Sequence, residues 1–96
     1  MKPIALVAIG VLLSGSAPLE LTCKLQSKSP AREWRFFRVY DASTGEVLLR
    51  QAVNGGDRKT IYSKHDQVRV EFKLPGHTVY QPSIVAPCKG GNTIER

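Results

Sequence analysis

One segment, VRVEFKL at residues 68–74, alternates apolar and charged residues without a fault. Successive side chains of an extended strand point to opposite faces, so a period of two indicates a strand with one face in a core and one in solvent. We therefore predict a strand there, with Val68, Val70, Phe72 and Leu74 pointing inward.

The same alternation runs through residues 19–26. Leu19, Leu21, Cys23 and Leu25 fall on one face, and the residues between them are polar. The pattern predicts a first strand that points the Cys23 side chain into the core.

The aromatic segment EWRFFRVY, residues 33–40, breaks the alternation at the Phe36–Phe37 doublet. Its aromatic and β-branched content favours a strand, whereas the spacing of Trp34 and Phe37 leaves a short helix as the alternative. A β-bulge at the doublet would reconcile the pattern with a strand. It would place Trp34, Phe36, Phe37 and Val39 inside and Arg35 and Arg38 outside.

Turn signals divide the rest of the chain into short segments. DASTG at 41–45 predicts a hairpin turn, and NGGD at 54–57 is the strongest turn signal in the sequence. Further strands are predicted at 46–53, 59–62, 78–80 and 83–86. Six or seven short strands with no convincing helix indicate an all-β fold, a small antiparallel β-sandwich or a small barrel.

The first residues have the composition of a secretory signal. Lys2 supplies a positive charge, residues 4–13 form an apolar run, and small residues follow it. Because a membrane-spanning helix needs roughly 20 apolar residues, a permanent anchor is the less favoured interpretation. We expect residues 1–16 to be a cleaved signal peptide, and residues 17–96 to form a single domain whose tail, 89–96, frays.

Cys23 and Cys88 are the two cysteines of the chain. In an oxidising compartment the cysteines of a small domain usually pair, so we predict a disulfide that joins the first strand to the last. Closing a loop of about 65 residues would contribute roughly 4 kcal/mol of stability. Lipidation of Cys23 is disfavoured, because the charged Glu20 stands where a lipid-attachment sequence needs an apolar residue.

The expected mature chain is basic. The sequence has 14 basic and 8 acidic residues, and removal of Lys2 leaves 13 against 8, a formal charge of +5. This charge favours anionic partners such as lipid headgroups, anionic polymers or acidic protein surfaces, while export makes nucleic acid the least expected of them. The alternative is a solvated basic surface that only keeps the protein soluble.

A basic cluster lies in and around the first two predicted strands. If those strands pair, Lys24, Arg35 and Arg38 share an outward face with Tyr40 beside them. Because arginine and aromatic residues are enriched in contact surfaces, we predict these four as binding residues. A solvated sheet face is the alternative.

No sequence pattern predicts catalysis, a metal site or a cofactor. Ser63, His65 and Asp66 have the residue types of a hydrolase triad, but adjacent His and Asp side chains diverge, whereas triad members converge from separate elements. His65 and His77 have no nearby carboxylate or thiol set with which to hold a metal. We therefore expect a protein that is not an enzyme.

With DASTGEVLL followed further along by VRVEFKLPGH, residues 37–85 resemble transthyretin-like and carboxypeptidase-regulatory-like β-sandwich modules. The resemblance rests on turn residues that those modules share, Thr44, Gly45, Pro75 and Gly76. His77 departs from the pattern, because those modules usually carry Tyr or Phe there. The resemblance implies an exported, non-catalytic accessory or binding module.

These features predict an exported, periplasmic or extracellular binding or accessory protein. Its partner would be a protein, in an envelope or cell-surface assembly or as the target of an inhibitor. The alternative is a basic module that binds an anionic polymer or a membrane surface. No transmembrane anchor is expected in the mature chain.

Overall fold

The computed structural model describes residues 20–96. The predicted signal peptide at 1–16 and Leu19 of the first predicted strand lie outside the described residues. Seven strands make up the described chain: β1 (Leu21–Gln26), β2 (Trp34–Asp41), β3 (Val47–Asn54), β4 (Arg58–Ser63), β5 (Gln67–Lys73), β6 (Ile84–Pro87) and β7 (Asn92–Glu95). Over residues 20–96 there is no helix capable of crossing a membrane.

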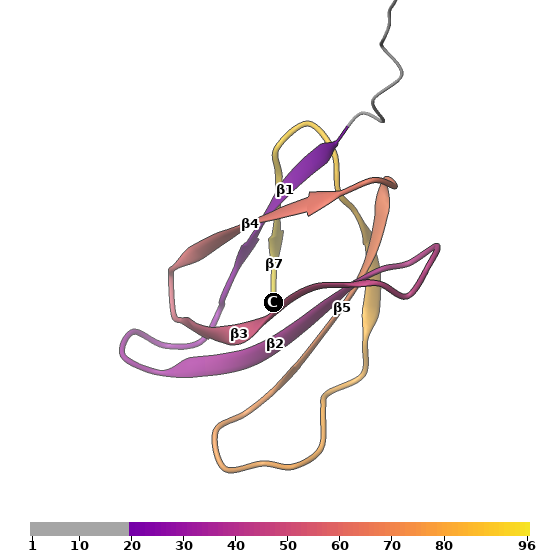
Figure 1. Cartoon of the computed structure of the whole chain (residues 1–96). Helices are drawn as coiled ribbons and strands as arrows, with labels where there is room; N and C mark the ends of the chain where they lie inside the picture. Colours follow the sequence, from indigo (N-terminus) through magenta and orange to yellow (C-terminus); the bar gives the residue numbers. More distant parts are fainter. Residues whose placement is uncertain (1–19) are drawn as a thin grey trace, which may run out of the picture.

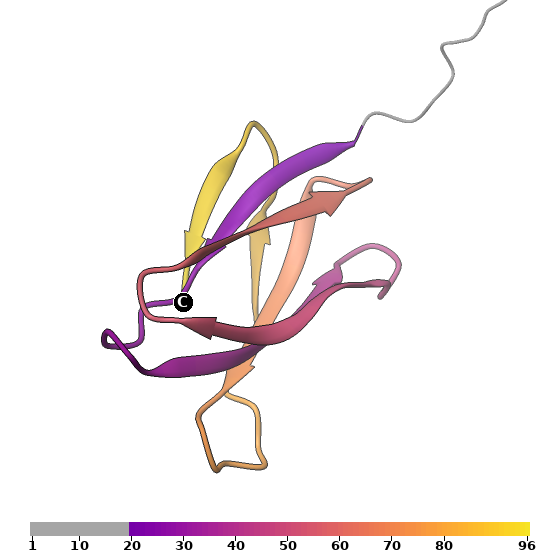
Figure 2. The same ribbon diagram turned by 60° about the vertical axis from the view of Figure 1, so that its left-hand side comes forward.

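The strands form two sheets that pack face to face (Figures 1 and 2). The smaller sheet has the order β4-β1-β7, and the larger has the order β3-β2-β5-β6. Neighbouring strands run antiparallel except β1 and β7, which are parallel. The prediction of a small antiparallel β-sandwich of six to seven strands is confirmed, with the parallel pairing of β1 and β7 as the exception.

The core lies between the two sheets and follows the predicted alternation. Cys23 and Leu25 of β1 and Val68 and Val70 of β5 are fully buried. The largest other buried apolar side chains are Phe37, Val39, Val53 and Ile61. Burying one large apolar side chain stabilises the fold by roughly 1.5–3 kcal/mol. This gain explains why the strands with strict alternation adopt the predicted orientation.

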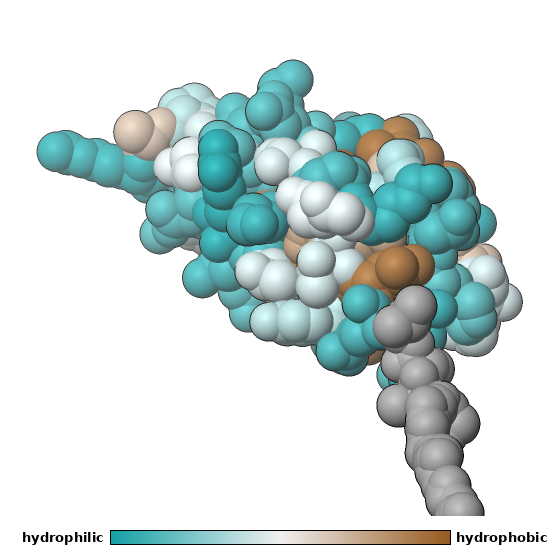
Figure 3. Space-filling model, turned by 90° about the horizontal axis from the view of Figure 1, so that it is seen from above, coloured by the Kyte–Doolittle hydropathy of each residue, from teal (hydrophilic) through white to brown (hydrophobic). Residues whose placement is uncertain are grey.

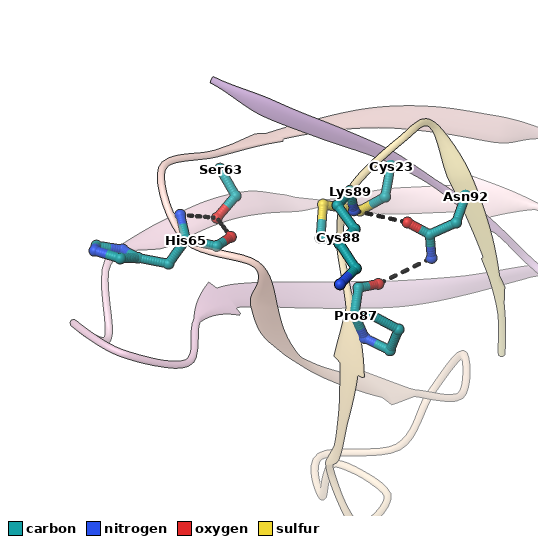
Figure 4. The surroundings of a disulfide bond; sticks show 7 residues. All are labelled: Cys23, Ser63, His65, Pro87, Cys88, Lys89 and Asn92. Atoms are coloured by element: carbon teal, nitrogen blue, oxygen red, sulfur yellow. Dashed lines mark hydrogen bonds between the residues drawn. A yellow bond between two sulfur atoms is a disulfide. The ribbon is translucent and has the colours of Figure 1, made fainter. Parts of the chain in front are cut away.

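The predicted disulfide between Cys23 and Cys88 is present, with the two Cα atoms 4.9 Å apart (Figure 4). Cys88 directly follows β6, so the bond joins β1 of the smaller sheet to the end of the larger sheet. Both cysteines are fully buried. The bond therefore ties the two layers of the sandwich together from inside the core.

The expectation that residues 89–96 fray is wrong. After Cys88 the side chain of Asn92 accepts a hydrogen bond from the Lys89 N–H (2.8 Å) and donates one to the Pro87 carbonyl (2.9 Å) (Figure 4). This turn returns the chain alongside β1, where β7 pairs with residues 23–26. Ile94 is then buried in the core, which compensates for the ordering of a polar tail.

The bulge predicted at Phe36–Phe37 is also wrong. β2 is an interior strand, and its register against both β3 and β5 is regular at the doublet; a shift against β3 occurs between Val39 and Tyr40 instead. Regular alternation points Phe37 inward and Phe36 outward, on the same side as Trp34. Hydrogen-bonded neighbours on both sides of β2 fix this register, and they are not visible in the local sequence.

Residues 74–83 leave the larger sheet as a loop that projects beyond it (Figure 1). The His77 N–H donates to the Leu74 carbonyl (3.0 Å), and the Gln81 N–H donates to the Phe72 carbonyl (2.7 Å). The strand predicted at 78–80 does not form, because no neighbouring strand pairs with it. The loop instead brings Tyr80 back to the outside of the sheet.

Candidate functional site: an aromatic and basic sheet face

The four predicted binding residues do not share one face. β1 pairs with β4 and β7, whereas β2 pairs with β3 and β5, so the pairing of the first two strands on which that prediction depended is wrong. Lys24 lies on the smaller sheet. Arg38 and Tyr40 lie on the outer side of the larger sheet, and Arg35 lies on its inner side, in the same row as Phe37.

The outer side of the larger sheet carries aromatic and basic side chains in register. Residues directly opposite in adjacent strands face the same side. Phe36 stands opposite Lys73, Arg38 lies between Arg50 and Glu71, and Tyr40 stands opposite Arg69. We call this surface the aromatic-basic face. It comprises Trp34, Phe36, Arg38, Tyr40, Arg50, Ala52, Arg69, Glu71, Lys73 and Tyr80.

Cation–π contacts connect these side chains. The guanidinium carbon of Arg38 lies 3.6 Å from the centroid of the Tyr80 ring and 5.8 Å from that of Tyr40. The Lys73 ammonium lies 5.3 Å from the Tyr80 centroid and 5.6 Å from that of Phe36. Each cation is thus held between two rings, which limits the rotamer freedom of two long side chains before any partner binds.

Glu71 is the acidic member of the aromatic-basic face. Its carboxylate forms an ion pair with the Arg38 guanidinium and accepts a 3.5 Å hydrogen bond from the Tyr40 hydroxyl. The carboxylate therefore orients Arg38 and Tyr40 together. Four basic side chains against this one carboxylate leave the face with a formal charge of +3.

Tyr80, Phe36, Lys73 and Glu71 were not predicted as site residues. The first two were missed because the loop that returns Tyr80 and the register that turns Phe36 outward depend on pairing between distant residues. A signal for the other two is present in the sequence, because Lys73 and Glu71 occupy the outward positions of the strictly alternating segment at 68–74. Opposite-charge and cation–aromatic residues at outward positions of two strands indicate a shared surface only once the strand order is known.

The apolar residues on the surface are dispersed. Of the most exposed large ones, Tyr62, Val85 and Val47 lie in three different strands, and Val79 lies in the loop of residues 74–83. Seen from above in Figure 3, the molecule is mostly hydrophilic with small, separate hydrophobic patches. Among the surfaces of residues 20–96, the aromatic-basic face is therefore distinguished by charge and aromatic stacking rather than by a broad apolar patch.

Ser63, His65 and Asp66 do not converge. The Ser63 hydroxyl donates to the His65 carbonyl (2.7 Å; Figure 4), and the His65 ring is turned to Asp41, with Nδ1 2.6 Å from Oδ2. Ser63 itself is buried. These contacts close the turn between β4 and β5 and tie it to the end of β2.

The carboxylate of Asp41 is buried and accepts the hydrogen bond that ties His65 to the end of β2. The His65 ring and the backbone N–H groups of Ser43 (2.8 Å) and Thr44 (3.3 Å) surround it. The hydrogen bond to His65, together with those backbone bonds, holds the pKa of Asp41 below its usual value of 3.8 despite the opposing effect of burial. In residues 20–96 no three His, Cys, Asp or Glu side chains are grouped in a way that could hold a metal ion.

Comparisons with known proteins add no relative from which a function could be transferred. No protein-family model matches the sequence. No curated protein and no solved structure matches the chain significantly. The resemblance to transthyretin-like and carboxypeptidase-regulatory-like modules therefore stays a prediction, and the aromatic-basic face is described from its own geometry.

Proposed function

We propose that this is an exported binding protein that uses the aromatic-basic face to contact an acidic surface on a protein partner. The observation that carries the proposal is the stacking of Arg38 on Tyr80, 3.6 Å from guanidinium carbon to ring centroid, within a face of formal charge +3. Arginine and tyrosine are the residue types that most often dominate binding energy in protein interfaces. The protein would act as a subunit or accessory of an envelope or cell-surface assembly, or as an inhibitor.

Preorganisation of the face supports this proposal. Immobilising a rotamer-rich side chain on binding costs about 0.5–1.5 kcal/mol. Arg38 and Lys73 are already held between aromatic rings, and Glu71 fixes Arg38 further. A partner would therefore meet two ordered cations flanked by the exposed Arg50 and Arg69, whose outer charges would steer an acidic surface toward the face.

Export is supported by two features. Lys2 and the apolar run at 4–13 have the form of a signal peptide. The buried disulfide between Cys23 and Cys88 is typical of small domains in oxidising compartments. The partner is therefore expected in the periplasm or outside the cell.

The test is charge reversal at the exposed rim of the face. In Arg50→Glu/Arg69→Glu the two exposed cations become anions, while the Arg38–Tyr80 contact is left in place. Lys64→Glu/Lys89→Glu changes the net charge by the same amount on exposed turns elsewhere. Immobilised mature protein would be exposed to proteins released from the native envelope, and retained proteins compared by mass spectrometry.

We expect the wild-type protein to retain one protein specifically. Arg50→Glu/Arg69→Glu should fail to capture that protein, and Lys64→Glu/Lys89→Glu should capture it at the wild-type level. Equal retention by both double variants would remove the aromatic-basic face from consideration. Equal loss in both would show that net charge, not this face, governs capture.

The formal charge of +3 on one face also favours a second candidate function, binding of an anionic polymer. In that case, the protein should bind heparin at low salt and elute as screening increases. Arg50→Glu/Arg69→Glu should elute at lower salt than Lys64→Glu/Lys89→Glu. Flow-through of the wild-type protein at low salt would rule against this candidate and leave the protein partner.

A further inference from the structure

We propose that the end of the sandwich, between the two sheets, holds a binding site for a phosphate-class oxyanion. The site is a pocket of about 470 Å³ lined by Lys28, Arg35, Phe72, Glu95 and Arg96. It lies on the inner side of the larger sheet and is separate from the aromatic-basic face on the outer side. The proposal therefore does not depend on the function proposed for that face.

Two arginines from opposite sheets meet at this pocket. Arg35 begins the inward-facing row of β2 that continues as Phe37, and Arg96 extends the inward row of β7 beyond Ile94. Both guanidinium groups lie over the Phe72 ring, with the Arg35 carbon 4.7 Å and the Arg96 carbon 5.8 Å from its centroid. The fold thus directs two planar cations to the same point at the end of the core.

The backbone fixes the third cation beside them. The Lys28 N–H donates to the Arg96 carbonyl oxygen (2.6 Å), and the Arg96 N–H donates to the Gln26 carbonyl oxygen (3.1 Å). These bonds join the segment that leaves β1 to the end of β7. Lys28 and Arg96 are therefore held as neighbours by hydrogen bonds that do not use their side chains.

The charges of these side chains are not neutralised within the described chain. Three cations and one carboxylate line the pocket, and in residues 20–96 none of the three cations forms a salt bridge with Glu95 or any other group. The Arg35 Nε is buried without a hydrogen-bond partner among those residues. Buried donors are usually satisfied, and neighbouring guanidinium groups repel one another unless an anion lies between them.

Phosphate fits these requirements. Its several oxygens accept charge-assisted hydrogen bonds from more than one guanidinium group, a pairing for which arginine is well suited. Its charge at neutral pH offsets the excess of positive side chains. The pocket volume lies within the range of about 300–1,000 Å³ that small-molecule sites occupy, so a phosphate monoester with a small organic group packed against Phe72 would also be accommodated.

The test is a titration of the folded, disulfide-bonded protein followed by two-dimensional amide NMR. The probes are inorganic phosphate and glycerol 2-phosphate, each added at constant ionic strength, with sodium chloride as the reference. The variants are Arg35→Gln, Arg96→Gln and Lys28→Gln. Lys64→Gln/Lys89→Gln, which removes two exposed cations from turns outside the pocket, is the control.

We expect saturable shifts of the amides of residues 28, 35, 72 and 96 with phosphate and not with chloride. Arg35→Gln and Arg96→Gln should each weaken binding at least tenfold, and the control should bind as the wild type does. Tighter binding of glycerol 2-phosphate would identify an ester as the ligand class, and equal binding would identify free phosphate. Because Lys28 is exposed, Lys28→Gln should fold as the wild type does and show weakened binding even if an arginine variant does not fold.

Shifts that are linear in concentration, that chloride reproduces, or that persist unchanged in folded Arg35→Gln or Lys28→Gln would overturn the proposal. Arg50→Glu/Arg69→Glu should retain phosphate binding in the pocket. Loss of partner capture with retained phosphate binding would separate the aromatic-basic face from the pocket.

Discussion

Arg38 of β2 forms an ion pair with Glu71 of the adjacent strand β5 and lies over the ring of Tyr80, which belongs to the loop after β5. One side chain of β2 is thus joined both to the neighbouring strand and to that loop. Tyr80 also contacts Lys73. One tyrosine thus orders two cations of the aromatic-basic face and attaches the loop of residues 74–83 to the sheet.

Tyr80→Ala should reduce the free energy of unfolding by about 1–2 kcal/mol, because it removes two cation–π contacts. It should also increase amide hydrogen exchange in residues 74–83. Tyr80→Phe keeps the aromatic ring and should match the wild type in both measurements. A Tyr80→Phe variant as destabilised as Tyr80→Ala would show that the hydroxyl, rather than the ring, holds the loop.

Cys23→Ala/Cys88→Ala should lower the free energy of unfolding by about 4 kcal/mol, measured by chemical denaturation. The disulfide closes a long loop, with a sequence separation of 65 residues, and restricts the unfolded chain accordingly. A loss below about 1 kcal/mol would contradict the view that this bond, rather than the core alone, secures the two sheets.

Asp41→Asn should make the free energy of unfolding less dependent on pH in the acidic range. Because the folded-state pKa of Asp41 lies below the ordinary value of 3.8, its stabilising contribution is fully present above that value. The contribution is lost as the pH falls through the folded-state pKa. Urea denaturation between pH 6 and about pH 2 should therefore show a steeper decline for the wild type than for Asp41→Asn.

Asp66→Asn is the matched control for that experiment, because it removes an exposed carboxylate from the turn in which His65 lies. Its acid profile should follow the wild type. A profile as flat as that of Asp41→Asn would assign the acid sensitivity to general charge rather than to the buried contact between Asp41 and His65.

Gly55→Ala should destabilise the fold by about 3 kcal/mol, since overpacking costs this much where the surroundings are unable to move. A Cβ atom at this position would overlap the backbone carbonyl oxygens of Ser29 and Pro30. Gly56 has a positive φ of 84° but open space around it, so Gly56→Ala should cost only about 1 kcal/mol. Thermal unfolding of both variants would show which of them loses more stability. A smaller loss for Gly55→Ala than for Gly56→Ala would contradict the close approach of the Ser29 and Pro30 carbonyl oxygens to Gly55.

The parts of the fold that the sequence predicts well are those with a strong local signal. The alternation at 68–74 and at 21–25 indicated the orientation of β5 and β1 and the inward Cys23, because an apolar face must be buried whatever the partner strand. The pairing with Cys88 followed from cysteine number and domain size. The turn at 41–45 likewise indicated the β2–β3 hairpin.

The errors concern relationships between distant segments. The doublet Phe36–Phe37 has no unique local solution, and its register is set by β3 and β5 on either side. The tail at 89–96 has one large apolar residue, Ile94, whose burial depends on a parallel pairing with β1. Local patterns carry no information on such pairings.

Only part of the candidate site could be predicted, because its other members are brought together by pairing between distant segments. The sequence predicts Arg38 and Tyr40 as binding residues because arginine and aromatic residues are enriched in contact surfaces, and the two do lie on one outward face. The prediction of Lys24 and Arg35 on the same face depends on a strand pairing that does not form. Tyr80 joins the face through a loop whose path is determined by the Gln81–Phe72 backbone bond.

The central claim is that the aromatic-basic face is the surface that contacts the partner, and site-specific photo-crosslinking in the native envelope tests it most directly. A photoreactive residue would replace Ala52, an exposed position opposite Phe36 on this face, or Thr60, an exposed position opposite Lys24 on the smaller sheet. We predict a discrete adduct from position 52 that Arg50→Glu/Arg69→Glu suppresses, and none from position 60. An adduct from position 60 without one from position 52 would contradict the claim.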